Sequence, residues 1–164
     1  MVAAMETKRV LSKVASQIGY STLRPKQEEV ILDFVRGSDV FVSLPTGSGK
    51  SLCYSLLPGV FDEIHRLQGV SIVIVVSPLV ALMRDQVRAM TERNIRAVYV
   101  GDAGDDATVD EICEGNFQLV LMSPESILTD LMWRDMLQSP IYQDNLVAVA
   151  VDEAHCVEQW LVWN

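Results

Sequence analysis

The sequence of 164 residues contains few cysteines and no apolar run long enough to cross a membrane. Its three cysteines, Cys53, Cys113 and Cys156, are widely spaced and form no Cys-x-x-Cys pair, which argues against a zinc site and a disulfide framework. The longest apolar stretch, residues 70–76, is far shorter than the ~20 residues that span a bilayer. The first twenty residues lack the continuous apolar segment of a secretory signal. We therefore expect an intracellular protein with reduced thiols and no membrane partner.

The sequence also lacks an excess of positive charge. It has 13 Lys and Arg against 22 Asp and Glu, for a formal net charge of −9. Nucleic-acid-binding proteins usually carry a basic face, so this balance lowers the DNA affinity expected of the chain by itself. It leaves open binding through backbone amides and a few well-placed side chains. With 49% apolar and 21% charged residues, the composition is typical of one globular domain with a hydrophobic core.

The spacing of apolar residues predicts alternating strands and helices. Five short apolar runs predict strands, at residues 39–43, 70–76, 96–100, 118–122 and 146–151. Helical spacing predicts helices at residues 5–18, 25–36, 50–65, 79–93, 106–114 and 124–138. This alternation indicates an α/β fold, with a mainly parallel sheet flanked by helices.

A glycine-rich loop follows the first predicted strand and reads Leu-Pro-Thr-Gly-Ser-Gly-Lys-Ser from Leu44 onward. Gly47 and Gly49 lack a Cβ atom, so the backbone can curl and direct several N–H groups at one anion. Lys50 would reach the β- and γ-phosphates of a nucleotide, and the Ser51 hydroxyl would hold Mg²⁺. Leu44 stands where the G-x-x-x-x-G-K-[ST] pattern has its first glycine, which weakens the case for a kinase or small GTPase. The alternative is a simple strand–helix turn with a solvated lysine.

An acidic pair follows the last predicted strand. Residues 146–151 are wholly apolar, as in a strand buried on both faces of a parallel sheet, and Asp152 and Glu153 come directly after them. Open α/β sheets bind ligands at the carboxyl ends of their strands. Asp152 would hold Mg²⁺, and Glu153 would polarise the attacking water as a general base. The alternative is a solvated pair of acids at a strand end.

Five stretches in order complete a pattern that spans most of the chain. They are Gly19-Tyr20 with Leu23-Arg24-Pro25-Lys26-Gln27, the loop from Leu44 to Tyr54, Ser77-Pro78-Leu79 with Leu82-Met83 and Asp85-Gln86, Ser123-Pro124-Glu125, and Asp152-Glu153-Ala154-His155-Cys156 with Gln159-Trp160. With these motifs, residues 19–160 resemble the first motor domain of RecQ-type DNA helicases, a branch of the superfamily-2 helicases. The resemblance implies a RecA-like P-loop NTPase domain at residues 19–164, preceded by a helical segment at residues 1–18.

The resemblance also implies which residues bind and hydrolyse ATP. Gln27 would hydrogen-bond adenine N6 and N7 bidentately, and Tyr20 or Arg24 would stack on the base. The alternative for Gln27 is an exposed residue at a helix start. The implied nucleotide-binding residues are Tyr20, Arg24, Gln27, Thr46, Gly47, Ser48, Gly49, Lys50 and Ser51. The implied metal-binding residues are Ser51 and Asp152, and the implied catalytic residues are Lys50, Asp152, Glu153 and His155.

Four residues are implied in DNA binding by the same resemblance. Ser77 and Pro78 follow one buried strand and would face a DNA phosphate, as would Ser123 after another. Trp160 is the candidate for stacking on a base. The alternative for Ser77 and Ser123 is a purely structural role. The alternative for Trp160 is a position in the core.

After Trp160 the sequence departs from the family pattern. Leu161-Val162-Trp163-Asn164 stands where Gly-His-Asp-Phe-Arg-Pro is usual, so the aromatic-rich loop that couples DNA contact to ATP hydrolysis in the family is cut and altered. The second motor domain, with its arginine fingers, is missing from these residues. We therefore expect half of an ATP site and no unwinding by this chain alone.

The function implied for the full protein is that of a 3′–5′ DNA helicase of the nucleus, which binds single-stranded or forked DNA and uses ATP and Mg²⁺ to unwind DNA. One alternative is a non-enzymatic nucleotide-binding short form. Another is an unrelated P-loop enzyme, such as a kinase of small molecules. Leu44, Gln27 and the Asp-Glu-Ala-His tetrapeptide from Asp152 argue against that second alternative.

Overall fold

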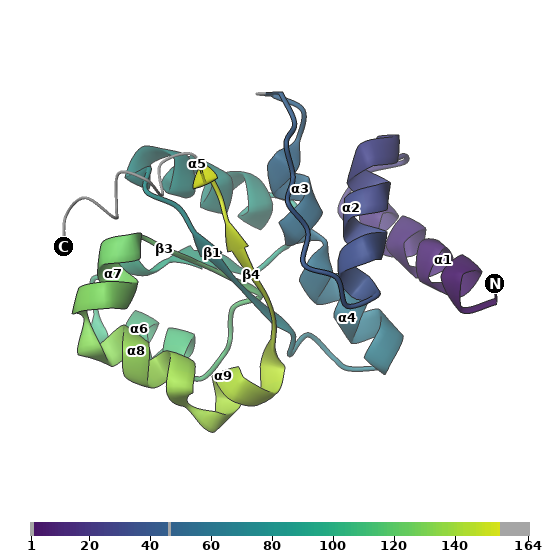
Figure 1. Cartoon of the computed structure of the whole chain (residues 1–164). Coiled ribbons are helices and arrows are strands. Elements are labelled where there is room, and N and C mark those ends of the chain that lie inside the picture. The colour runs from purple at the N-terminus through teal and green to yellow at the C-terminus, as the bar shows by residue number, and fades with distance from the viewer. Residues whose placement is uncertain (1, 46, 155–164) are drawn as a thin grey trace.

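A computed structural model of the chain describes residues 2–45 and 47–154 (Figure 1). In these residues the helices are α1 (Val2–Gln17), α2 (Pro25–Val35), α3 (Lys50–Ser55), α4 (Leu57–His65), α5 (Val80–Thr91), α6 (Asp106–Cys113), α7 (Pro124–Thr129), α8 (Leu131–Gln138) and α9 (Pro140–Asn145). The strands are β1 (Ile72–Val76), β2 (Ala97–Tyr99), β3 (Leu119–Met122) and β4 (Leu146–Val151). A short 3-10 turn, Val100–Asp102, follows β2.

The four strands form one parallel sheet in the order β2-β3-β1-β4, with helices on both faces (Figure 1). Successive side chains of a strand point to opposite faces, so β1 contributes to two cores. Val73 and Val75 pack with residues of α1 to α5, whereas Ile72, Ile74 and Val76 pack with residues of α6, α8 and α9. The predicted α/β fold with a mainly parallel sheet is confirmed.

Most predicted helices are present, but two of them are broken and one helix was not predicted. The predicted helix 50–65 divides into α3 and α4 at Leu56, and the predicted helix 124–138 divides into α7 and α8 at Asp130. Asp130 caps α8 because its carboxylate accepts a hydrogen bond from the Met132 N–H at 3.0 Å. Helix α9 begins with Pro140 after a capping serine, Ser139, a pattern that could have revealed it.

Residues 39–43 do not form a strand, contrary to the prediction. They are not part of the sheet, and Phe41 is 85% exposed. Strand β4 also differs from the prediction, because it lies at one edge of the described sheet. Its Val149 and Val151 are 56% and 49% exposed, so residues 146–151 are not buried on both faces as expected. A short apolar run favours an extended chain. A strand also requires a backbone ladder with a neighbour, and that depends on tertiary packing.

The first helix shares the core of the domain. Leu11, Val14 and Ala15 of α1 are buried in the same cluster as Val73 and Val75 of the central strand. In the part of the chain that the structure describes, every helix is too short or too polar to cross a bilayer.

Candidate nucleotide-binding site

The glycine-rich loop leads directly into α3, which begins at Lys50. Gly47 and Gly49 have φ angles of 76° and 78°, in the left-handed region that glycine adopts without steric cost. A Cβ atom added at Gly49 would lie 2.7 Å from Nε2 of Gln27, whereas at Gly47 it would meet open space. Gly49 is therefore required by its backbone angle and by its neighbour, and Gly47 by its backbone angle alone.

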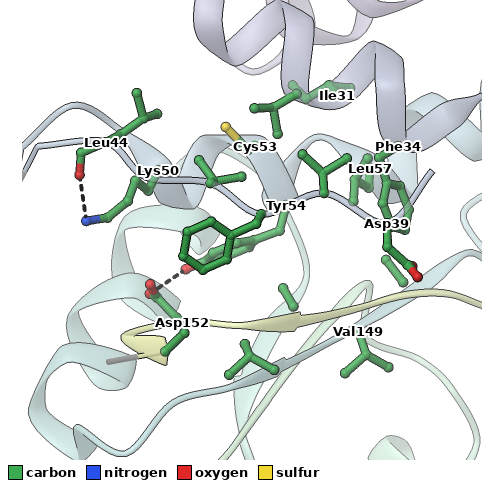
Figure 2. A pocket seen from close by; sticks show the side chains of 18 of the residues that line it. Ile31, Phe34, Asp39, Leu44, Lys50, Cys53, Tyr54, Leu57, Val149 and Asp152 are labelled. Atoms are coloured by element: carbon green, nitrogen blue, oxygen red, sulfur yellow. Dashed lines mark hydrogen bonds between the residues drawn. The ribbon is translucent and has the colours of Figure 1, made fainter. Parts of the chain in front are cut away.

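Lys50 contacts Leu44, the residue that stands where the G-x-x-x-x-G-K-[ST] pattern has its first glycine. Its Nζ atom donates to the backbone oxygen of Leu44 at 3.2 Å (Figure 2). The contact uses only the main chain of residue 44, so it does not depend on which side chain is present there. The Leu44 side chain lines the adjacent cavity instead.

Asp152 lies just beyond β4, where its N–H donates to Val76 O at 2.8 Å. Its carboxylate accepts three hydrogen bonds. Oδ1 accepts from the Glu153 N–H at 3.0 Å, while Oδ2 accepts from Tyr54 Oη at 3.2 Å and from Gln86 Nε2 at 3.0 Å. The two partners of Oδ2 come from α3 and α5, so three elements meet at this one carboxylate (Figure 2 draws the Tyr54 bond).

Lys50, Asp152 and Glu153 line one cavity of about 520 Å³. The cavity lies between β4 on one side and α2, α3 and residues 39–44 on the other (Figure 2). Glu153 has a φ angle of 53°, which is unusual for a residue other than glycine. Backbone strain of this kind is concentrated at functional sites.

The hydroxyl of Tyr54 stays protonated in this site. Burial and the neighbouring charge of Asp152 raise the pKa of Tyr54 well above its ordinary value, and hydrogen bonds from Ser51 and Gln86 only partly oppose this. Sequence reasoning placed Tyr54 and Gln86 within family motifs but gave neither residue a role of its own at Asp152. Tyr54 follows Lys50 by four residues, so both lie on one face of a helix, and this spacing could have drawn attention to it.

The residues present fit a magnesium ion bound together with a nucleotide. Among the residues that the structure describes, no group of three or more His, Cys, Asp or Glu side chains is placed to hold a metal. Mg²⁺ is usually held by one or two carboxylates, phosphate oxygens and water rather than by an all-protein cage. Ser51 lies in the first turn of α3, and the Asp152 carboxylate accepts a hydrogen bond from Tyr54 of the same helix, so the hydroxyl of Ser51 and the carboxylate of Asp152 are two oxygen ligands that the site offers such an ion.

Gln27 is turned toward the glycine-rich loop. The residue is only 5% exposed, and its Nε2 donates to Ser48 O and to Gly49 O, both at 3.1 Å. Its Oε1 accepts from the Arg24 N–H at 3.0 Å, and the Arg24 side chain also donates to Ser48 O, at 3.0 Å. Both ends of the Gln27 amide are therefore bonded to the protein, and this side chain holds the loop against the start of α2.

The residues expected to bind adenine converge on a second cavity, of about 290 Å³. Tyr20, Arg24 and Gln27 line it together with the loop residues Gly47, Ser48, Gly49 and Ser51. The guanidinium of Arg93 lies over the ring of Tyr20, 4.8 Å from its centroid. Sequence reasoning did not find Arg93, which comes from the loop after α5.

Two of the residues expected to contact DNA, Ser77 and Ser123, are placed side by side but are buried. Ser77 and Ser123 follow the paired strands β1 and β3, and Ser77 is completely buried. Ser123 caps α7, since its hydroxyl accepts from the Ser126 N–H at 3.2 Å. Neither hydroxyl is presented to solvent. Pro78, which lies between Ser77 and α5 in the sequence, is half-buried.

Three further candidates, Thr46, His155 and Trp160, lie outside the described residues. Nothing in the structure bears on their roles.

The sequence profile of the DEAD/DEAH box helicase family matches residues 24–163. The ATP-dependent DNA helicase RecQ of Haemophilus influenzae is 32% identical over 160 residues, which are 95% of this chain and 24% of the relative. The ATP-dependent helicase SGS1 of Saccharomyces cerevisiae is 40% identical over 142 residues, which are 84% of this chain and 10% of the relative. This chain therefore spans a quarter or less of the length of these relatives.

Among solved structures, the crystal structure of the DUF1998 helicase MrfA bound to DNA and AMPPNP matches 88% of this chain and 20% of its own, with a TM-score of 0.70 and 22% identity. That likeness concerns the fold. The expected resemblance to RecQ-type helicases is confirmed by the sequence relatives. Because the family profile covers most of the chain, the protein belongs to the DEAD/DEAH box helicase family.

Proposed function

We propose that this chain is the ATP- and magnesium-binding first motor domain of a RecQ-like helicase that moves 3′ to 5′ on DNA. The observation that carries the proposal is the shared cavity of Lys50, Asp152 and Glu153, although Lys50 lies far from the two acidic residues in the sequence. A positive group for phosphate, an oxygen ligand for a metal and a carboxylate base are three of the groups that take part in the hydrolysis of a nucleotide.

The proposal assigns a role to each of these side chains. Lys50 neutralises charge on the β- and γ-phosphates while the N–H groups of the loop surround them. Ser51 and Asp152 hold Mg²⁺, which when bound offsets the negative charge of the phosphates. Glu153 accepts a proton from the attacking water as general base. Tyr20 and Arg24 lie beside the base, and Gln27 connects the base site to the loop.

The assignment of Lys50 has a direct test. Replacing Lys50 with alanine removes a full charge from the phosphates, so ATP binding should fall below detection while the thermal unfolding temperature changes little. Lys50 donates only one hydrogen bond to the protein, to Leu44 O, among those that the structure gives for it. Titration calorimetry of wild type and Lys50→Ala measures this, and equal affinities would contradict the phosphate-loop assignment.

Catalysis requires more than these residues. Neither Glu153 nor Asp152 neutralises the charge that develops on the far side of the γ-phosphate, and arginine fingers that do so are worth about 10³–10⁵ in turnover. By resemblance, those arginines belong to the second motor domain of RecQ-type helicases. The 164-residue chain should therefore bind Mg·ATP and hydrolyse it no faster with single-stranded DNA than without it.

Phosphate release with and without DNA tests this argument in three proteins. These are the chain alone, the chain joined to a RecQ-type second motor domain with the aromatic-rich loop restored, and the joined protein with Glu153→Gln. The joined protein should show DNA-stimulated hydrolysis, and Glu153→Gln should abolish it. Strong stimulation of the chain alone would refute the half-site argument. An inert joined protein that binds ATP would favour a nucleotide-binding module without enzymatic activity.

The DNA partner is part of the same proposal, as are roles in repair and recombination and, in a eukaryotic host, a nuclear location. These rest on the family and the names of the relatives. The buried positions of Ser77 and Ser123 indicate that DNA phosphates would meet the backbone or exposed neighbours of these residues before their hydroxyls.

A further inference from the structure

Two side chains outside the proposed catalytic set hold the Asp152 carboxylate. Tyr54, on α3, and Gln86, on α5, both donate to Asp152 Oδ2, at 3.2 Å and 3.0 Å. They lie 98 and 66 residues from Asp152 in the sequence. Their convergence on a single oxygen atom is therefore a product of the fold and is not a local turn or cap.

Among the described residues, these hydrogen bonds leave one lone-pair position of the carboxylate unused. An ionised carboxylate offers about four lone-pair positions. Oδ2 uses two of them for Tyr54 and Gln86, and Oδ1 uses one for the Glu153 N–H at 3.0 Å. Within the described residues the remaining position is on Oδ1. Because three donors fix the rotation of the group, that position has a set direction.

Gln86 has an acceptor that the protein does not satisfy. Only the NH₂ group of its amide is chemically compatible with a carboxylate, so its Oε1 must point away from Asp152. Among the described residues, this Oε1 is buried and has no hydrogen-bond partner. Buried polar atoms are rarely left unpaired in native proteins. The amide therefore meets the site through its NH₂ group, which donates to Asp152 Oδ2.

We propose that Tyr54 and Gln86 are positioning residues for Asp152, which orient its carboxylate so that one lone pair of Oδ1 faces the magnesium ion of a bound Mg·ATP. The inference rests on the proposed function, since it requires that Asp152 holds the metal. Both residues act on the metal through Asp152.

Binding of a fluorescent ATP analogue, titrated with Mg²⁺ and repeated in EDTA, separates the metal-dependent part of the affinity from the rest. Tyr54→Phe removes one hydroxyl and keeps the ring, and Gln86→Met keeps the length of the side chain but removes the amide. In each variant the Mg²⁺ concentration for half-maximal binding should rise about tenfold or more, as is usual when a partner of a metal ligand is removed. The affinity measured in EDTA should change much less than this.

Matched controls come from the opposite face of the sheet. Tyr142 is also fully buried and donates a hydrogen bond, to Ile112 O at 2.7 Å, and Gln143 donates to Leu137 O at 2.8 Å. Tyr142→Phe and Gln143→Met should leave the Mg²⁺ requirement unchanged. A purely structural role for Tyr54 and Gln86 predicts that their variants lower the thermal unfolding temperature without raising the Mg²⁺ requirement.

The outcomes distinguish this inference from the proposed function. Wild type that binds Mg·ATP, with an unchanged Mg²⁺ requirement in folded Tyr54→Phe and Gln86→Met, would overturn the positioning role and leave the proposed function standing. Wild type that binds no nucleotide with or without Mg²⁺ would overturn both. If one variant fails to fold, the other decides, and Gln86→Ala supplies a second change at the same position.

Discussion

Replacing Gln27 with alanine should weaken ATP and GTP binding alike. If Gln27 acted only by reading adenine, its loss would affect ATP and spare GTP. In the structure its amide is instead bonded to the carbonyl oxygens of Ser48 and Gly49, and to the backbone N–H of Arg24. Its removal therefore frees the phosphate-binding loop, which serves every nucleotide regardless of its base.

The size of the effect follows from these contacts. Each of the two bonds to the loop contributes about 0.5–1.5 kcal/mol net, so together they are worth about 1–3 kcal/mol. If all of this free energy is lost from nucleotide binding, the affinities for ATP and GTP both fall roughly 5- to 150-fold. The third bond, to Arg24, stabilises the start of α2, and its loss should destabilise the fold by about 0.5–2 kcal/mol.

Calorimetric titration of ATP and of GTP, together with urea unfolding, measures these effects in wild type and in Gln27→Ala. Gln143→Ala, a glutamine on an exposed part of α9, is the control. If the affinity for ATP falls more than the affinity for GTP, the difference measures how far Gln27 also recognises adenine, beyond its effect on the loop. A loss confined to ATP, with unchanged GTP affinity and unchanged stability, would refute the argument that Gln27 supports the loop.

Two further predictions test the fold around the site. Amide hydrogens of Val40 and Val42 should exchange with solvent much faster than those of Val73 and Val75, because only the second pair lies in the central strand, and equal protection would show that residues 39–43 pair as a strand. Burial raises the pKa of the Cys53 thiol from 9.0 to about 11, so at pH 8 its thiolate fraction is about a hundredfold below that of an ordinary thiol. With the other cysteines replaced by serine, its reaction with a disulfide reagent should be correspondingly slow at pH 8 and should speed up as the pH approaches 11, whereas fast labelling of the folded chain at pH 8 would contradict its burial. The stabilising effect of this raised pKa is complete below pH 9 and is lost between pH 9 and 11, because the unfolded thiol ionises first.

Local patterns in the sequence were sufficient to predict the alternation of helices and strands and the start of the helix after the glycine-rich loop. The Gly-x-Gly-Lys-Ser run predicted a phosphate loop with Lys50 at a helix start, and the structure begins α3 at that residue. The apolar run before Asp152 predicted a strand, which is β4. These features depend on a few consecutive residues, whose backbone angles and apolar spacing act over short distances.

Contacts between distant elements were decided only by the tertiary structure. Gln27 reads as a base-binding residue in its motif, yet its amide bonds the loop because α2 packs beside it. Tyr54 and Gln86 meet Asp152 only because α3 and α5 cover the same face of the sheet. Residues 39–43 have the composition of a strand but no ladder in the described chain. In each case the partner lies far away in the sequence, and a hydrogen bond requires both groups to come within about 3 Å with the right orientation, which only the packing of the helices on the sheet determines.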